Sequence, residues 1–403
     1  MAPLLLYIGG EDHHLRIPAM LALREHGIRV TAAATGDSAP FVRAGIDYRR
    51  FRFERFINPL ADWTAIKAVA RLLLDVRADI AQSFDTKPSL LLPLAARGMR
   101  DVRVIRTITG RGWLFSSHSP LALTLRPVYR ALHRLAARST TATVFQNRDD
   151  LAYFERHRMV GRGASRVIPE AVDVDGFERA LTLGPSPAQL RDELGLGTSE
   201  VVITVTRMTR QKGILTLLKA AALVHEARPG VRFLLVGPRQ SEGPLAITQG
   251  EIDRHAPYVM AIGPRSDVPA LLRLADVFAF PTEYREGLPR ALLEAALAGL
   301  PIVTTCIPGC CDVIRDGWNG FLVPLRAPQM LATKILDLLR DREAGRTMGG
   351  RAAKLVGREF GLRTIVARQV ALYAELIDRA HGSRLPMMDG SLEHESCGRE
   401  MCS

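Results

Sequence analysis

The chain alternates short runs of apolar residues with longer segments in which apolar residues recur every three or four positions. The short runs are typical of buried strands, and the longer spacing is typical of helices that bury one face. After Gly213, for example, Ile214, Leu217, Leu218 and Ala221 share one side of a predicted helix. The predicted strands span residues 4–8, 30–34, 80–83, 102–107, 143–146, 201–206, 231–236, 259–262, 277–281, 301–304 and 321–324.

Each predicted strand is followed by a helical segment, and repeated strand–helix units form parallel sheets through right-handed crossovers. A length of 403 residues, at about 150 residues per domain, predicts two such domains. Gly, Pro and Ser interrupt the pattern at 181–187, where we place the boundary. We therefore predict an α/β protein with doubly wound, Rossmann-like domains at 1–180 and 181–360, a helix at 361–381 that returns to the first domain, and a disordered tail at 382–403.

The composition describes a globular protein, since 47% of residues are hydrophobic, 24% are charged and the mean hydropathy is +0.05. These values exclude a disordered, collagen-like or disulfide-stapled chain. The longest apolar runs fall far short of the roughly 20 residues that a membrane-spanning helix needs. Because the first residues lack a basic leader and resemble a buried strand, we expect the protein to reside in the cytoplasm.

The net charge of +12 is carried almost entirely by arginine, with 48 arginines and six lysines. Residues 1–180 hold 27 Lys and Arg against 18 Asp and Glu, a net of +9. A basic half attracts nucleic acid, an anionic membrane surface or a phosphorylated substrate, and the charge alone does not choose between them. A solvated, arginine-rich surface with no ligand is the alternative.

The cysteines do not indicate a disulfide framework or a metal site. Their number is odd and all lie in the last quarter of the chain, at Cys306, Cys310, Cys311, Cys397 and Cys402. Zinc sites usually pair two cysteines with a second pair or with histidines elsewhere, and that pattern is missing here. We expect no metal and no cofactor.

The first chemical motif follows the predicted strand 201–206. Arg207 and Lys212-Gly213 occupy the loop between this strand and the next helix. In parallel sheets, ligands bind beyond the carboxyl ends of the strands, where a helix N-terminus supplies free N–H groups and the positive end of its dipole. Two cations in such a loop suit a diphosphate, although a surface loop with ordinary ion pairs has the same sequence.

A second motif follows the predicted strand 277–281. The chain turns at Gly287 and enters a helix with Pro289 in its first turn. Glu286 and Glu294 lie at the mouth of this helix and about two turns along it. Carboxylates repel phosphates but accept hydrogen bonds from sugar hydroxyls. The two motifs together therefore favour a nucleotide sugar as ligand.

These residues resemble the family 4 glycosyltransferases of GT-B architecture, in which two Rossmann-like domains face a central cleft. The resemblance covers roughly residues 1–380 and is most specific in the second half. It looks most like bacterial enzymes that build capsule, exopolysaccharide or O-antigen. The matching stretches are Arg207 to Gly213, Val236-Gly237, Glu286 to Glu294, Ala298 to Thr305, Pro308 to Cys310 and Asp316 to Val323, with Asn58 to Leu60, Lys87-Pro88 and Phe145 to Asp150 in the first half.

The resemblance implies a role for each matched donor-side residue. Arg207 and Lys212 would bind the donor diphosphate and stabilise the charge that grows on it as the glycosidic bond breaks. Glu294 would hold the ribose hydroxyls and Glu286 the transferred sugar. The backbone of Gly287 and Leu288 would reach the distal phosphate or the sugar, and Gly263 and Arg265 would flank the base. Family members transfer the sugar with retention and without a dedicated metal.

The acceptor side matches less closely. Gly9 and Gly10 resemble the family's glycine-containing acceptor loop, and His14 matches a family histidine, although an ordinary surface histidine fits equally. Thr109 stands at the position where family members commonly have a histidine near the donor sugar. The usual role of that position is therefore in doubt for this chain. Asp173 and Asp175 have the spacing of a metal-binding D-x-D pattern, but they match a family position with a local structural role.

Other classes remain as alternatives. A GT-B sugar-nucleotide epimerase shares the fold, whereas a phosphorylase would hold a pyridoxal lysine in a far longer chain. A basic nucleic-acid-binding protein is disfavoured because only 6% of residues are aromatic, too few for a stacking platform. A dinucleotide dehydrogenase is disfavoured because the first strand ends in Gly9-Gly10-Glu11 without a G-x-G-x-x-G fingerprint.

The partners follow from transfer chemistry. We expect a nucleotide-sugar donor, with UDP favoured over GDP or ADP, a lipid-linked or saccharide acceptor, and no nucleic acid. The basic first half, with Arg49, Arg50, Arg52 and Arg55 close together, suits a polyprenyl-diphosphate-linked acceptor and peripheral contact with the anionic inner membrane face, at about 1 kcal/mol per cation.

Overall fold

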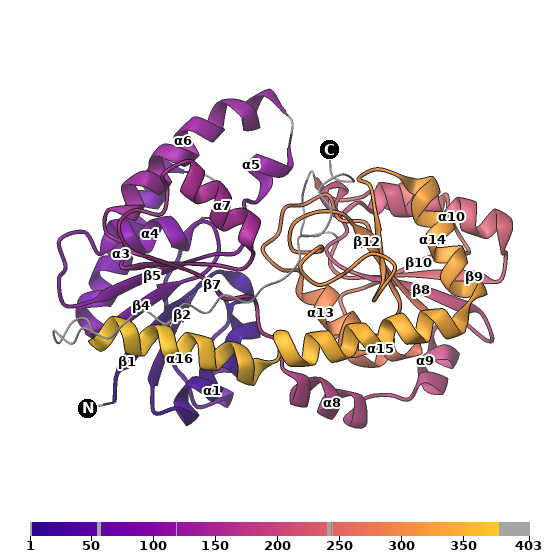
Figure 1. The fold of residues 1–403 in the computed structure, drawn as a ribbon, viewed down its shortest axis with the longest axis horizontal. Helices are drawn as coiled ribbons and strands as arrows, with labels where there is room; N and C mark the ends of the chain where they lie inside the picture. The colour runs from indigo at the N-terminus through magenta and orange to yellow at the C-terminus, as the bar shows by residue number, and fades with distance from the viewer. Residues whose placement is uncertain (1, 55–57, 118, 240–242, 244, 379–403) are drawn as a thin grey trace. The chain divides into compact units, whose positions relative to one another are not determined.

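The computed structural model describes residues 2–54, 58–117, 119–239, 243 and 245–378 (Figure 1). These residues form two compact units, each with its own parallel sheet. The first unit contains residues 2–171, 286–288 and 362–378, and the second contains residues 172–285 and 289–361. The predicted tail at 382–403 lies outside the described residues, as does Arg55.

The first unit is built on a seven-stranded sheet with the order β3-β2-β1-β4-β5-β6-β7. Its strands are β1 (Leu4–Ile8), β2 (Arg29–Ala34), β3 (Asp47–Arg50), β4 (Ile80–Ser83), β5 (Arg103–Ile108), β6 (Ala142–Phe145) and β7 (Ala164–Val167). Its helices are η1 (Glu11–Arg16), α1 (Ile17–Glu25), α2 (Ala39–Arg43), α3 (Pro59–Val76), α4 (Pro88–Ala95), α5 (Trp113–Ser116), α6 (Pro120–Ala137), α7 (Arg148–Arg156) and α16 (Leu362–Asp378).

The two faces of this sheet are covered by different helices because alternate residues of a strand point to opposite sides. Leu5 and Tyr7 of β1 join one apolar cluster with α1 and α16, and Leu6 and Ile8 join another with α3 and α4. Helix α16 is fixed further by polar contacts, since the Tyr373 hydroxyl lies 3.2 Å from the Tyr7 hydroxyl. The last described helix of the chain therefore completes the core of the first unit (Figure 1).

The second unit has a six-stranded parallel sheet with the order β10-β9-β8-β11-β12-β13. Its strands are β8 (Glu200–Val205), β9 (Val231–Val236), β10 (Val259–Gly263), β11 (Val277–Phe280), β12 (Ile302–Thr305) and β13 (Phe321–Val323). Its helices are α8 (Val174–Leu183), α9 (Pro187–Glu193), η2 (Arg210–Lys212), α10 (Ile214–Ala227), α11 (Gln249–Asp253), α12 (Val268–Leu274), α13 (Arg290–Leu297), α14 (Pro328–Arg340) and α15 (Arg342–Glu359).

The core of this unit follows the predicted pattern. Val202 of β8, Phe233 of β9 and Val277 of β11 are buried against α10 and α14. The predicted class, an α/β protein with two doubly wound parallel sheets, is confirmed. Two strands escaped prediction, β3 and β7, and each lies at an edge of the first sheet.

Candidate active site

The strand order of the second unit reverses beside β8. The chain moves from β8 to β9 and β10 on one side, and then returns to place β11 on the other side of β8. Ligands of such sheets bind in the crevice that forms outside the carboxyl ends of the strands at this point. The loop with Arg207 and Lys212 follows β8, and the loop that contains Glu286 follows β11. The sequence-predicted donor motifs thus leave the two strands that flank the reversal.

Lys212 lies where these two loops meet. The residue is 6% exposed, and its ammonium lies 5.2 Å from the centre of the Tyr284 ring. The N–H of Glu283 donates to the carbonyl of Gln211 at 2.9 Å, which holds the loop after β11 against the loop after β8. A cation enclosed at the carboxyl ends of parallel strands and directly before a helix is well placed to bind an anion. Arg207, in the same loop, is half-buried.

Gly213 makes this arrangement possible. Its φ of 70° lies in the left-handed region, and a Cβ there would lie 1.8 Å from the carbonyl oxygen of Pro281. The backbone directly after β11 therefore touches the start of α10 with no room for a side chain. This contact fixes the direction in which Lys212 enters the loop.

The second predicted carboxylate, Glu294, lies on α13 and is about one-fifth exposed. Its Oε1 accepts a hydrogen bond of 2.9 Å from Nε of Arg290, one turn earlier on the same helix. Pro289 directly precedes the helix, which begins at Arg290. Arg290 therefore orients the Glu294 carboxylate near the start of α13.

The structure places Gly263 at the end of β10 and Arg265 two residues further on. Gly263 has a φ of 74° and open space at its Cβ position. The Arg265 guanidinium is engaged by two carboxylates, since it lies 2.7 Å from Asp267 and 2.7 Å from Glu193. These hydrogen bonds raise the pKa of Arg265. Its charge is thus compensated within the second unit.

Residues 286–288 belong to the first unit, together with Thr109. Glu286 pairs with Gly110 in an isolated antiparallel bridge, and the N–H of Gly287 donates to the Thr109 carbonyl at 2.9 Å. The Asn147 side chain donates to the Gly287 carbonyl at 2.8 Å. Leu288 is buried. The backbone of this short segment is therefore held by the loops that follow β5 and β6.

The glycine loop after β1 lies at the corresponding reversal of the first sheet, between β1 and β4. The Gly10 N–H donates to Asp85, which follows β4, at 3.1 Å. His14 is exposed, whereas its neighbour His13 is fully buried under Gly9. Burial lowers the pKa of His13 to about 3, so this ring is neutral at pH 7.

A polar network that the sequence did not predict lies beside Thr109. Nε of Arg111 donates to Asp150 at 2.7 Å, and the guanidinium stacks over Tyr153. Asp150 also accepts from Asn147 at 3.0 Å. Burial raises the pKa of Asp150 to about 6 despite the opposing charge of Arg111. The signal available in the sequence was a pair of polar clusters directly after two predicted strands.

Arg16 forms a second unpredicted group at the carboxyl ends of the first sheet. Its side chain is 11% exposed and lies 3.7 Å from Asp85 and 3.8 Å from Glu170. The guanidinium also lies 4.5 Å from the centre of the Phe84 ring. These groups surround the predicted acceptor loop with charged and aromatic side chains.

The remaining predicted features have local roles. Asp173 accepts from the N–H of Gly176 at 2.9 Å and so caps α8.

Within the ranges that the structure describes, no three His, Cys, Asp or Glu side chains are grouped as a metal site. None of the helices in the described part of the chain is long and apolar enough to cross a bilayer.

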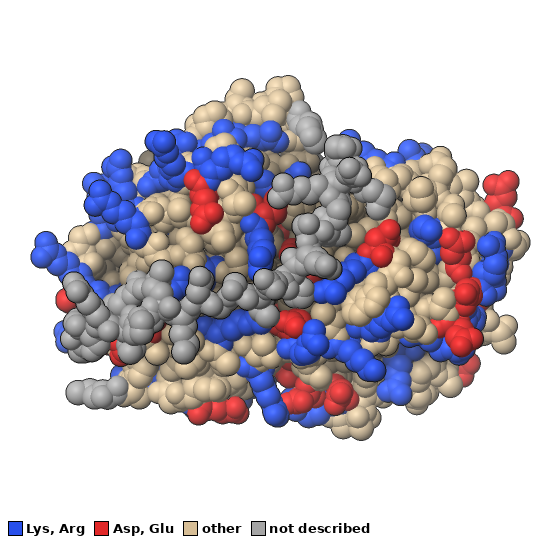
Figure 2. All heavy atoms as spheres, in the orientation of Figure 1, with Lys and Arg blue, Asp and Glu red and all other residues tan. Residues whose placement is uncertain are grey.

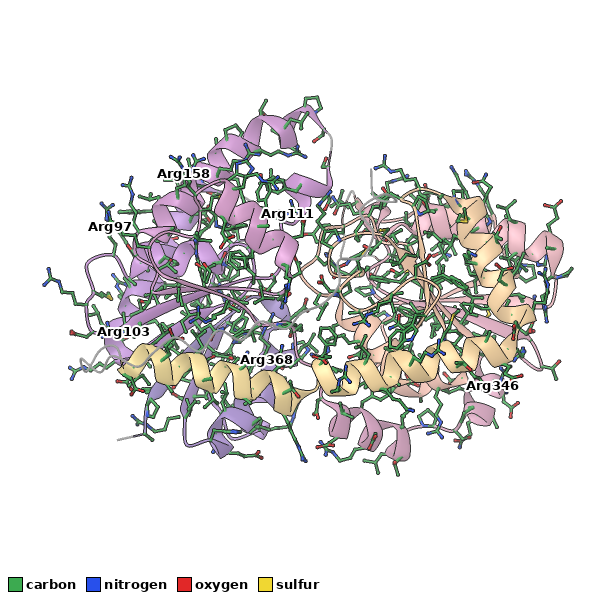
Figure 3. The ribbon with its side chains drawn as sticks, viewed as in Figure 1. Arg97, Arg103, Arg111, Arg158, Arg346 and Arg368 are labelled. Carbon is green, nitrogen blue, oxygen red and sulfur yellow. The ribbon has the colours of Figure 1, made fainter. Side chains whose placement is uncertain are left out.

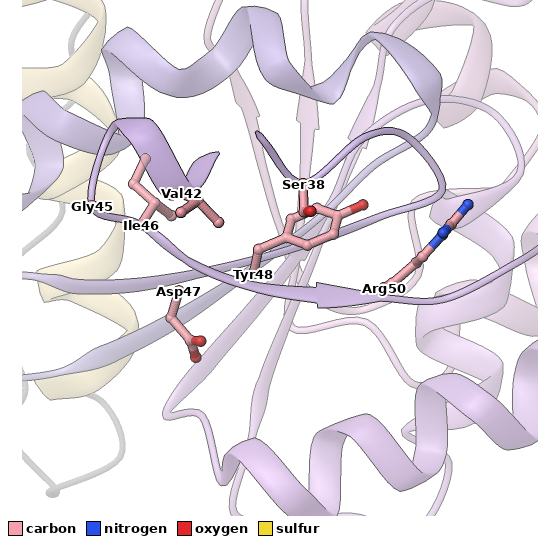
Figure 4. Close-up of a pocket in the computed structure, with 7 residues that line it drawn as sticks. All are labelled: Ser38, Val42, Gly45, Ile46, Asp47, Tyr48 and Arg50. Carbon is pink, nitrogen blue, oxygen red and sulfur yellow. The ribbon is translucent and has the colours of Figure 1, made fainter. Parts of the chain in front are cut away.

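An open hollow of about 530 Å³ lies against β3 (Figure 4). Its lining contains Ser38, Val42, Gly45, Ile46, Asp47, Tyr48 and Arg50. The Tyr48 hydroxyl is engaged by the carbonyl oxygens of Ala34 and Gly36, at 2.8 and 2.7 Å. Arg50 is the one lining residue that the sequence analysis named, as part of the basic cluster near residue 50, and we assign the hollow no role.

Solved structures share this fold. HepE of Anabaena, crystallised with UDP-glucose, matches with a TM-score of 0.75 at 20% identity, over 93% of this chain and all of that one. Sucrose-phosphate synthase of Thermosynechococcus elongatus matches with a TM-score of 0.75 at 18% identity, over 94% of this chain and all of that one. The fold is therefore that of the two-domain GT-B class.

The sequence comparisons identify the family. A family model described as "Glycosyl transferases group 1" matches residues 199–341, and one described as "Glycosyl transferase 4-like domain" matches residues 12–171. Together these matches span well over half of the chain. The chain belongs to this family of glycosyltransferases, and it is an enzyme of that class.

Two bacterial relatives are similar over much of the chain. A UDP-Gal:alpha-D-GlcNAc-diphosphoundecaprenol alpha-1,3-galactosyltransferase of Escherichia coli is 28% identical over 291 residues, which are 72% of this chain and 73% of that one. An N,N'-diacetylbacillosaminyl-diphospho-undecaprenol alpha-1,3-N-acetylgalactosaminyltransferase of Campylobacter jejuni is 22% identical over 376 residues, which are 93% of this chain and 98% of that one.

Proposed function

We propose that this glycosyltransferase moves a sugar, with retention, from a UDP-sugar to a polyprenyl-diphosphate-linked acceptor during the synthesis of a bacterial surface polysaccharide. The reaction would take place at the cytoplasmic side of the membrane. Both relatives described above carry a diphospho-undecaprenol acceptor in their names, and the Escherichia coli relative carries UDP-galactose as donor. HepE, with the same fold, has been crystallised with UDP-glucose.

The observation that carries the proposal is the enclosed Lys212 between the loops that follow β8 and β11. In the proposed reaction, the bond between the anomeric carbon and the β-phosphate oxygen breaks, and the acceptor hydroxyl bonds to that carbon on the same face. The hydroxyl proton passes to the leaving phosphate. Lys212 and Arg207 stabilise the negative charge that develops on the diphosphate, and no metal is assigned to this role.

The remaining residues have binding roles in this proposal. Glu294, oriented by Arg290, accepts hydrogen bonds from the ribose hydroxyls. Glu286 and the backbone N–H of Leu288 contact the transferred sugar and the distal phosphate, whereas the polar backbone groups of Gly287 are engaged by Thr109 and Asn147. Apart from residues 286–288, which belong to the first unit, the donor is bound by the second unit, and the acceptor is bound by the first.

The test combines donor binding with turnover. UDP should raise the melting temperature more than GDP or ADP, because a ligand that binds only the folded state stabilises it. Lys212→Ala should lower kcat by about 100-fold or more while the protein remains folded. Lys219→Ala, an exposed lysine on α10, provides the matched control.

Three outcomes would contradict the proposal. Normal turnover in Lys212→Ala would remove the assigned role of the lysine. Equal loss in Lys219→Ala would show that the effect is not specific to the site. Conversion of the UDP-sugar into its epimer without any acceptor would favour the epimerase alternative.

A further inference from the structure

Arg16 is an almost enclosed arginine of the first unit. Lys and Arg side chains gather on the visible surface of this unit, where Arg97 and Arg158 point outward (Figures 2 and 3). The Arg16 side chain is instead only 11% exposed and lies over the Phe84 ring. Its Nε is buried and makes no hydrogen bond to any residue that the structure describes. Because an unsatisfied buried donor is costly, a ligand that supplies an acceptor would be favoured here.

Two carboxylates stand beside Arg16 without closing a hydrogen bond to it. Oδ1 of Asp85 and Oε2 of Glu170 lie 3.7 and 3.8 Å from Nη2 of Arg16. A hydrogen bond between a guanidinium and a carboxylate is normally about 2.8 Å long. A ligand hydroxyl suits this arrangement, because it can accept from the guanidinium and donate to a carboxylate at the same time.

The Asp85 carboxylate is held from its other side and remains accessible. Its Oδ2 accepts from the Gly10 N–H at 3.1 Å, and its Oδ1 is the atom nearer to Arg16. The side chain is 37% exposed, so a ligand can reach it. Asp85 has a φ of 70°, a left-handed conformation that is uncommon outside glycine and clusters at functional sites. It follows β4, which flanks the reversal of the first sheet, where ligands of such sheets bind.

The charge of this cluster indicates the class of ligand. One guanidinium faces two carboxylates, so the cluster is negative overall. Burial by itself lowers the pKa of Arg16, but the charges of Glu170 and Asp85 outweigh burial and raise it, so the guanidinium stays protonated. The carboxylates repel a phosphate, whereas a neutral sugar offers hydroxyls that both donate and accept.

The cluster is joined to the segment that contains Glu286. Nε2 of Gln146 donates to Oε2 of Glu170 at 2.5 Å. A Cβ at Gly287 would lie 2.1 Å from Oε1 of Gln146, so this side chain also packs directly against Gly287. All four residues belong to the first unit. One side chain therefore connects Glu170 to the residue that follows Glu286.

We infer that Arg16, Asp85 and Glu170 form a subsite that binds hydroxyl groups of the acceptor sugar. Arg16 donates to a hydroxyl oxygen, and the Asp85 carboxylate accepts from the same hydroxyl or from its neighbour. The inference rests on the proposed function, because it assigns acceptor contacts of that reaction to particular residues. The diphosphate of a lipid-linked acceptor lies outside this cluster, since the two carboxylates repel it.

The first test is an NMR saturation-transfer titration of the full chain, with UDP present, using the methyl glycosides of N-acetylglucosamine, glucose, galactose and mannose. At least one glycoside should bind the wild type, and Asp85→Asn should weaken that binding about tenfold. Asparagine tolerates the left-handed backbone, so this variant should fold and retain its affinity for UDP. Asp101→Asn, at an exposed position of the same unit, is the matched control.

A second variant tests the guanidinium. Arg16→Gln should weaken binding of the same glycoside about tenfold, whereas Arg97→Gln, at an exposed position, should not. If Arg16→Gln does not fold, Asp85→Asn decides alone. The inference would be overturned by a wild type that binds none of the glycosides, or by unchanged binding in Asp85→Asn. An equal loss of UDP affinity in Asp85→Asn would also overturn it, since the effect would then be structural.

A further measurement separates this inference from the proposed function. The probe is a short-chain, water-soluble polyprenyl diphosphate that carries the sugar of the bound glycoside. With this acceptor, Asp85→Asn should raise the acceptor KM about tenfold and leave the KM for the UDP-sugar unchanged. Glycoside binding that Asp85→Asn weakens, together with no transfer to this probe by the wild type, would refute the lipid-linked reaction and leave the subsite intact.

Discussion

The buried ring of His13 occupies the space that a side chain at position 9 would need, and Gly9 leaves this space free. A Cβ at Gly9 would lie 2.1 Å from Nδ1 of the buried His13 ring. That ring is held in place because Nε2 donates to the Tyr7 carbonyl at 3.2 Å. The predicted acceptor loop therefore packs on the His13 ring. His13 directly precedes His14, the histidine that the sequence analysis named.

Gly9→Ala should destabilise the first unit by about 1–3 kcal/mol, the usual range for overpacking a filled site. The free energy of unfolding in urea measures the effect. Gly10→Ala is the control, since its Cβ would lie 3.4 Å from the nearest atom, in ordinary contact. Combining Gly9→Ala with His13→Ala should cost less than the sum of the two single changes. Additive losses would show that the two residues do not compete for space.

The buried His13 ring also predicts a pH dependence. Burial lowers its pKa from 6.5 to about 3. Between these two pH values, His13 is therefore protonated in the unfolded chain and neutral in the folded protein. The free energy of unfolding should therefore fall by about 1 kcal/mol per pH unit as pH decreases from 6.5 towards 3. Urea unfolding at several pH values should show a shallower dependence for His13→Gln. An unchanged slope would mean that His13 takes up its proton without unfolding.

At the scale of elements, the donor motifs depend on how closely two loops approach. Gly213→Ala would place a Cβ 1.8 Å from the Pro281 carbonyl in a backbone with a φ of 70°. We expect a loss of about 2 kcal/mol or more in stability and a marked loss of UDP binding, because the loops after β8 and β11 must separate. Calorimetry and urea unfolding measure both. Gly250→Ala, with open space on α11, should leave both quantities almost unchanged.

The two strands that the hydrophobic pattern missed have a common physical reason. β3 reads Asp-Tyr-Arg-Arg and β7 reads Ala-Ser-Arg-Val, and none of their residues is fully buried. Each pairs with a neighbour on one side only, because it lies at an edge of the sheet. An edge strand needs no continuous apolar run, so its sequence resembles that of a loop.

At the scale of the molecule, α16 stabilises the first unit, whose main stretch of chain ends at Ala171, nearly 200 residues earlier. Ile365, Val366, Leu372, Tyr373 and Leu376 join the core cluster of β1, β2 and α1. Leu372→Ala should therefore destabilise the first unit by about 2–5 kcal/mol and leave UDP binding by the second unit intact. Limited proteolysis mapped by mass spectrometry would locate the loss. Arg363→Ala, at an exposed position of α16, is the control, and an equal effect there would contradict the role of the buried face.

The sequence by itself determined the class of fold and the positions in it of the predicted donor motifs. Alternating buried strands and amphipathic helices have only a few ways to pack, and the loops with Arg207, Lys212 and Glu294 follow strands or start helices within a few residues. Local spacing was therefore sufficient to find them. The enzyme class followed from the resemblance to the family, whose two models match residues 199–341 and 12–171.

Tertiary structure alone decided which groups share a site and in what state. Arg265 is engaged by Glu193, 72 residues away, and Asp150 is buried against Arg111, 39 residues away. Leu121 and Val128 of α6 have the apolar side chains of core residues, but both are exposed in the structure. Burial and pairing depend on residues brought together from distant parts of the chain, and these set the charge, pKa and accessibility on which the chemistry depends.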